Sequence, residues 1–199
     1  MRQALRRPAA GWALLAVGLL PFAWLLWLGW QDALGANPAE YLIRATGDWT
    51  LRSLCVVLAV TPLRTVTGWP EWARFRRMLG LLTYFYAVLH LCCYAVFDMG
   101  LDWADILADI PKRTFILLGF AAWLLLTAMA LTSFNRAIRW MGAARWKQLH
   151  RSVYAVAVLA VLHFWWMRAG KNDFEEVLVY GAVLAALLGW RLWHRWAKN

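Results

Sequence analysis

The chain has 199 residues, of which 63% are hydrophobic and only 16% are charged, and its formal net charge is +10. A soluble domain is closer to half apolar and one quarter charged, so the composition excludes an ordinary soluble domain and indicates an integral membrane protein. Basic residues can also indicate nucleic acid, but here they lie between apolar segments, where the positive-inside rule accounts for them. The lipid bilayer is therefore the expected partner, and nucleic acid is not.

Six apolar segments follow one another, each close to the ~20 residues that cross a bilayer as a helix. Backbone groups in lipid must be hydrogen-bonded within the segment, so helices are the expected structure. No linker, repeat or low-complexity stretch suggests a second domain. The prediction is an all-α integral membrane protein with six transmembrane helices in one bundle and a single domain over residues 1–199. The predicted spans are residues 9–30, 49–67, 78–97, 114–133, 150–166 and 177–193.

The segments between the spans alternate in charge. Residues 31–48, 98–113 and 171–176 hold ten of the eleven acidic residues, and only Glu71 lies elsewhere. The amino terminus, residues 68–77, residues 134–149 and the tail are basic. Basic segments remain in the cytoplasm, so both termini are predicted to be cytoplasmic. All of these connections are predicted to be loops, with Gly35, Asn37 and Pro38 as helix breakers in the first one.

The three cysteines do not indicate redox or covalent chemistry. Cys55, Cys92 and Cys93 all lie inside apolar spans, and their number is odd. The sequence contains neither a CxxC nor a CxxCH motif, so neither a disulfide framework nor covalent haem attachment is indicated. Small buried packing residues are the expected role.

Histidine inside an apolar span is costly and usually functional. His90 and His163 each lie about 13 residues into the third and fifth spans, which run in the same direction. They are therefore predicted to lie at similar depth, where two neutral imidazoles could hold one iron, as axial histidines on facing helices hold haem. The alternative is that a histidine simply packs in the core or faces headgroups. His194, at the end of the last span, is interpreted as interfacial.

His150 opens the predicted fifth span, 13 residues before His163. That spacing is about 20 Å along a helix, and on an ideal helix the two rings point roughly 140° apart. Counting back by the same distance from His90 leads to Arg76 and Arg77, whose guanidinium groups cannot ligate a metal but suit phosphate or carboxylate. The site expected at the depth of His150 is therefore a five-coordinate haem, a haem with an unforeseen sixth ligand, or a flavin or quinone site.

Two runs resemble the third-helix and fifth-helix signatures of the MsrQ (YedZ) family. They are RRMLGLLTYFYAVLHL (Arg76–Leu91) and WKQLHRSVYAVAVLAVLHFWW (Trp146–Trp166). The runs GLLPFAWLLW, LGANPAEYLIRATGDW and VTPLR also resemble family positions, so the resemblance extends over nearly the whole chain. The family belongs to the ferric-reductase-like transmembrane group, whose oxidases typically carry two histidines on each of these helices. This chain has arginines at the first position of the third helix.

The resemblance implies a multi-pass haem b protein of the bacterial inner membrane, with a flavin mononucleotide (FMN) also attributed to the family. It implies electron transfer from the quinone pool to the periplasmic molybdopterin enzyme MsrP, which reduces methionine sulfoxide in oxidised proteins. Carried over by position, His90, His150 and His163 match the haem histidines, and Arg76 and Arg77 match a basic pair. The flavin and nicotinamide domains of the oxidases have no counterpart here, so a separate donor, such as quinol or reduced flavin, is expected.

The leading hypothesis is thus a transmembrane electron conduit, a redox subunit whose partner carries out sulfoxide reduction. The acidic stretch 98–109 is a candidate docking surface, although such stretches are often merely solvated. A non-redox membrane anchor or assembly subunit is the main alternative. A small transporter with a histidine proton relay is a third, but the spans hold few polar residues that could line its path.

Overall fold

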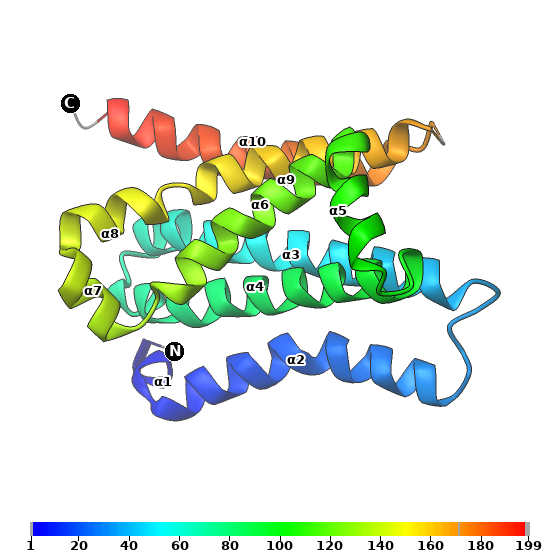
Figure 1. The fold of residues 1–199 in the computed structure, drawn as a ribbon. Helices are drawn as coiled ribbons and strands as arrows, with labels where there is room; N and C mark the ends of the chain where they lie inside the picture. Colours follow the sequence, from blue (N-terminus) through cyan, green and yellow to red (C-terminus); the bar gives the residue numbers. More distant parts are fainter. Residues whose placement is uncertain (1, 171, 198–199) are drawn as a thin grey trace. The chain divides into compact units, whose positions relative to one another are not determined.

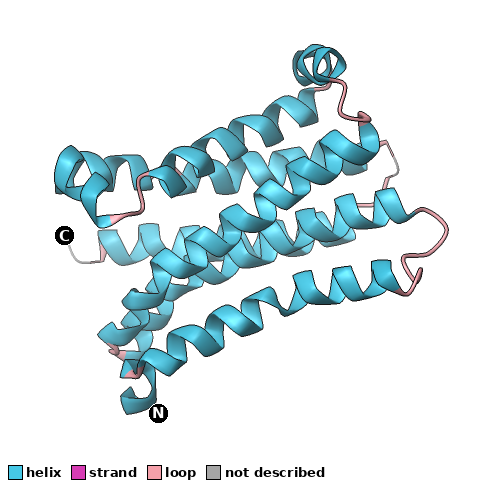
Figure 2. Ribbon diagram, turned by 60° about the horizontal axis from the view of Figure 1, so that its bottom comes forward, coloured by secondary structure: helices cyan, strands magenta, loops and turns pink. Residues whose placement is uncertain are grey.

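The structure, a computed structural model, describes residues 2–170 and 172–197, so Lys198 of the predicted basic tail lies outside it. The regular elements of these residues are helices (Figures 1 and 2). Six described helical segments are long and apolar enough to cross a membrane, which confirms the predicted all-α membrane protein with six spans. These segments are Pro8–Trp30, Pro38–Thr67, Pro70–Asp98, Thr114–Leu131, Ala143–Ala169 and Glu175–His194. The contacts divide the chain into two compact units, one up to Leu101 and one from Asp102 onward.

In the first unit, α3 (Pro38–Thr67) and α4 (Arg76–Cys93) pack along each other, and α2 (Pro8–Trp30) lies beside them (Figure 1). The core between them includes Leu54, Leu58 and Tyr86, which are 2% exposed or less. The Tyr86 hydroxyl donates a 2.7 Å hydrogen bond to the Gly18 carbonyl of α2. Buried apolar contact and a satisfied hydroxyl together attach α2 to α4.

The helix α3 begins at Pro38, eleven residues before the predicted start at 49, so the predicted loop over 31–48 is wrong in its second part. Asn37 is the N-cap: its side chain accepts a 3.1 Å hydrogen bond from the Glu40 backbone N–H and donates to the Glu40 carboxylate. This pairing resembles a capping box, in which the third helical residue also bonds back to the N-cap residue. Proline is favoured at the first helical position. Asn37 and Pro38, which were interpreted as helix breakers, therefore start a helix, whereas Gly35 lies in the loop before it.

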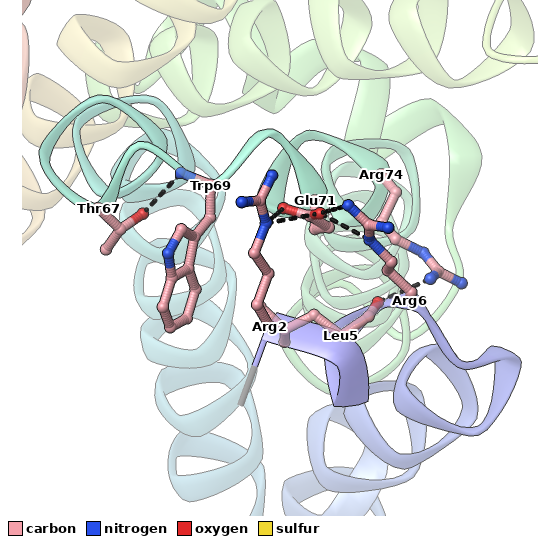
Figure 3. Close-up of polar contacts among 7 residues, drawn as sticks. All are labelled: Arg2, Leu5, Arg6, Thr67, Trp69, Glu71 and Arg74. Carbon is pink, nitrogen blue, oxygen red and sulfur yellow. Dashed lines mark hydrogen bonds and ion pairs between the residues drawn. The ribbon is translucent and has the colours of Figure 1, made fainter.

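The predicted basic loop over 68–77 is also largely helical. A 3₁₀ helix, η1 (Pro70–Phe75), leads directly into α4, and a π-helical turn, η2 (Tyr94–Asp98), follows it. Glu71 of η1 forms ion pairs with Arg2 (3.0 Å) and Arg6 (2.8 Å) of the short amino-terminal helix α1 (Arg2–Arg6), and Figure 3 shows both guanidinium groups pointing toward it. Its position among basic residues is explained by this pairing.

In the second unit, α6 (Thr114–Leu131) packs along α9 (Val153–Ala169), and α10 (Glu175–Trp196) packs against α9. Val156 and Ala157 of α9 and Val177 and Leu184 of α10 form much of its buried core. Three shorter helices occupy predicted loops, which corrects those predictions: α5 (Trp103–Lys112), α7 (Asn135–Met141) and α8 (Ala143–His150). Helix α5 starts because the Asp102 carboxylate accepts hydrogen bonds from two backbone N–H groups in its first turn.

The predicted fifth span does not run as one helix from His150. His150 is the last residue of α8, and a turn at Arg151 and Ser152 separates it from α9. The Ser152 backbone N–H donates to the Leu149 carbonyl at 2.9 Å, and the Ser152 hydroxyl donates to the same carbonyl at 2.6 Å. Serine side chains compete for backbone groups in this way and interrupt regular helix bonding. His150 and His163 therefore lie on opposite sides of a turn that divides the span Ala143–Ala169 into α8 and α9.

Candidate functional site

His90 lies in the first unit, near the end of α4, and its ring is held by α3. The Nδ1 atom is 2.9 Å from the Ile43 carbonyl oxygen and 3.5 Å from the hydroxyl oxygen of buried Thr46. A carbonyl oxygen only accepts hydrogen bonds, so Nδ1 is the protonated nitrogen of the neutral ring. The ligating lone pair of His90 is therefore on Nε2.

His163 has the same arrangement in the second unit. Its Nδ1 lies 2.6 Å from the Phe115 carbonyl oxygen of α6, so this ring also carries its proton on Nδ1. The ring contacts the Phe115 ring at 6.1 Å between centroids. Each histidine is thus held by a main-chain carbonyl of the helix that packs along its own.

This chemistry fits axial ligation of a haem iron. Metal-binding histidines usually donate the other ring N–H to a carbonyl or carboxylate, which sets the tautomer and makes the ligand more basic. In the part of the chain that the structure describes, no three His, Cys, Asp or Glu side chains gather into a metal site. A haem needs only axial protein ligands. His90 and His163 lie in different units, so their sharing of one iron stays a prediction.

His150 is held differently from the other two. Its Nε2 lies 3.3 Å from the Thr132 hydroxyl oxygen, and that hydroxyl donates to the Ala128 carbonyl at 2.8 Å. The hydroxyl oxygen therefore accepts from an Nε2–H group. The ring also stacks on Trp146 with centroids 4.0 Å apart, and the Trp146 indole donates to the Thr132 carbonyl at 2.9 Å. His150 therefore carries the opposite tautomer to His90 and His163.

The two arginines at the start of α4 lie in different environments. Arg76 is half-buried and donates a 3.0 Å hydrogen bond to the Thr61 hydroxyl of α3, whereas Arg77 is exposed. Both lie at the opposite end of α4 from His90. His194 stacks on Trp190 at 4.9 Å, and the three cysteines are free.

Sequence reasoning missed the two carbonyl partners, Ile43 and Phe115. Backbone carbonyls are present at every residue, so no side-chain pattern marks them. The first was also hidden because Ile43 lies in the part of α3 that was predicted to be a loop. The Asn-x-x-Glu pattern at Asn37 was the available signal for that helical turn.

The family model described as "Ferric reductase like transmembrane component" matches residues 46–161, which include His90 and His150 and end just before His163. With six candidate spans and carbonyl-anchored histidines on α4 and α9, the chain is a helical membrane protein of the ferric-reductase-like class. It belongs to the MsrQ family. No solved structure matches the chain at a significant level.

The similar proteins that show this membership cover nearly the whole chain. One from Polaromonas naphthalenivorans is 64% identical over 98% of this chain and 89% of its own length. One from Bordetella pertussis is 52% identical over 94% of this chain and 90% of its own length. One from Ralstonia nicotianae is 51% identical over 92% and 85%, respectively. Each of these relatives is named protein-methionine-sulfoxide reductase heme-binding subunit MsrQ.

Proposed function

We propose that this chain is the haem b-binding electron-transfer subunit of a methionine-sulfoxide reductase system in the bacterial inner membrane. The names of its relatives, heme-binding subunits of that reductase, support the proposal. The observation that carries it is the matching anchorage of His90 and His163. In each, Nδ1 donates to a backbone carbonyl, which is the arrangement of histidines that bind a metal through Nε2.

In this proposal His90 and His163 are the two axial ligands of a haem b. When bound, the haem supplies a one-electron carrier, and its potential depends on the axial ligands and on their burial. The Ile43 and Phe115 carbonyls hold the two imidazoles in one tautomer and orientation. The chain then acts as one ferric-reductase-like domain with both termini in the cytoplasm.

The proposed donor is the quinone pool, directly or through a reduced FMN, and the proposed acceptor is the periplasmic molybdopterin enzyme MsrP. Sulfoxide reduction, which repairs oxidised periplasmic proteins, takes place in that partner. Arg76 and Arg77 are the proposed cofactor-binding pair, because guanidinium groups suit the phosphate of FMN or the propionates of haem. The proposed donor and acceptor are tested by measuring electron transfer from a quinol to purified MsrP and methionine sulfoxide, with this chain inserted in vesicles.

The deciding experiment is a visible spectrum of the purified protein with variants at three histidines. We expect a Soret band with reducible α and β bands in the wild type. His90→Ala and His163→Ala should each lose the six-coordinate spectrum. His194→Ala is the control, because that ring stacks on Trp190 at the end of the last span and should leave the spectrum unchanged. A colourless wild type would instead indicate the non-redox anchor or assembly subunit.

We propose that His150 belongs to a second site of a different kind, as a ligand of a second haem or as a contact of a flavin or quinone. The opposite tautomer and the contacts with Thr132 and Trp146 support a separate role. The haem-to-protein ratio of His150→Ala separates the alternatives. Loss of about half the haem would indicate two haems, and an unchanged ratio would indicate that His150 holds no iron.

A further inference from the structure

Two glycines face the two anchored rings. Gly47 lies on α3, one helical turn after Ile43. A Cβ atom added to Gly47 would lie 3.1 Å from Cε1 and 3.2 Å from Nδ1 of His90. These separations are tighter than an ordinary van der Waals contact, so the imidazole would have to shift by a few tenths of an ångström to make room for a side chain at position 47.

Gly119 repeats this arrangement on α6, one turn after Phe115. A Cβ atom there would lie 2.8 Å from Nδ1 and 2.9 Å from Cε1 of His163, which is closer than real Cβ contacts come. The contact is with a planar ring whose Nδ1 is already hydrogen-bonded to Phe115. The ring therefore could not accommodate a methyl group at position 119 without moving.

Backbone conformation does not explain either glycine. The glycines with a left-handed φ in the described residues are Gly35, Gly68, Gly100 and Gly142, and neither Gly47 nor Gly119 is among them. Both lie inside helices, where glycine is less favourable than alanine. The space taken by the histidine ring is what makes glycine suitable at both positions.

We propose that Gly47 and Gly119 are positioning residues for the haem ligands. This inference rests on the proposed function, because it assigns the two histidines to iron. Each unit uses the same device: a carbonyl on the partner helix binds Nδ1, and a glycine one turn later allows the ring to reach it. The neighbouring helix thus sets the depth and rotation of each imidazole, and with them the position of Nε2.

Gly47→Ala and Gly119→Ala test the proposal, with Gly80→Ala and Gly189→Ala as matched helical controls that have no atom within 4 Å of the added Cβ. We expect wild-type haem content and a low-spin spectrum from both controls. The two test variants should lose the low-spin spectrum or the haem, Gly119→Ala more completely because its contact is closer. In a variant that keeps haem, added imidazole should restore the low-spin spectrum, since it replaces the displaced ligand.

A double-mutant cycle, measured by thermal unfolding in detergent, tests the proposal even if Gly119→Ala folds poorly. It compares the wild type, Gly119→Ala, His163→Ala and the double variant. We expect Gly119→Ala to lower Tm when His163 is present and to leave Tm unchanged or higher when position 163 is alanine, because no ring then opposes the methyl group. The same loss of Tm in both backgrounds would overturn the proposal.

The outcomes also separate this inference from the proposed function. A haem-containing wild type with wild-type spectra in Gly47→Ala and Gly119→Ala would refute the positioning role and leave the electron-transfer proposal standing. A colourless wild type would refute the electron-transfer proposal and, with it, the assignment of these glycines to haem ligands.

Discussion

Arg168 connects the carboxyl end of α9, the helix that carries His163, to the start of α10. Its side chain is only 8% exposed and forms ion pairs with Asp173 at 2.7 Å and Glu176 at 2.8 Å. Its guanidinium also lies over the Phe164 ring, 5.4 Å from the centroid. Arg168→Met removes the charge and keeps an unbranched apolar stem, so it isolates the contribution of the guanidinium.

The expected cost follows from the exposure of the partners. The Asp173 and Glu176 side chains are 48% and 47% exposed, so water screens both ion pairs. At about 0.5–1 kcal/mol for each screened pair, the two pairs contribute about 1–2 kcal/mol. The lost cation–π contact adds about 0.5–1 kcal/mol. Arg168→Met should therefore destabilise the protein by about 1.5–3 kcal/mol.

The assay is unfolding in mixed detergent micelles, followed by circular dichroism. It compares the wild type, Arg168→Met, the amide pair Asp173→Asn with Glu176→Gln, and the triple variant. We expect the amide pair to cost about 1–2 kcal/mol in the wild-type background and close to nothing in the Arg168→Met background, since the interaction energy is then already lost. Equal costs in the two backgrounds would refute the ion-pair reasoning. Haem absorption should stay unchanged, because His163 is anchored to α6.

Three further variants test local contacts. Asn37→Ala should destabilise α3 by about 1 kcal/mol through loss of its cap, whereas Asn37→Ser keeps an acceptor for the Glu40 backbone N–H and should lose less in the same unfolding assay; equal losses in the two variants would show that this acceptor does not stabilise α3. Thr132→Val removes the hydroxyl that meets His150 Nε2 and should cost about 1–3 kcal/mol, and an unchanged unfolding curve would contradict that contact. Glu71→Gln weakens the ion pairs that hold α1 and should speed trypsin cleavage after Arg6, measured by mass spectrometry; unchanged cleavage would show that α1 is held by other contacts.

The six spans could be predicted from the sequence because the bilayer imposes a length and a polarity on each of them. The connections could not be predicted equally well. Asn37 and Pro38 are suited both to a turn and to the start of a helix, and only the contact between Asn37 and Glu40 selects the helix. Likewise, the short helices α5, α7 and α8 are not long apolar segments, so the pattern that marks a span does not mark them.

In the candidate site, too, the sequence indicated some features and the tertiary structure decided others. His90 and His163 stood out because histidine is rare in apolar spans, and the resemblance to the MsrQ family is supported by the comparisons. The orientation of their rings was decided by tertiary structure alone. The Nδ1 partners are backbone carbonyls of Ile43 and Phe115, chemically the same as those of every other residue, and only the packing of α3 on α4 and of α6 on α9 brings these particular carbonyls to the rings.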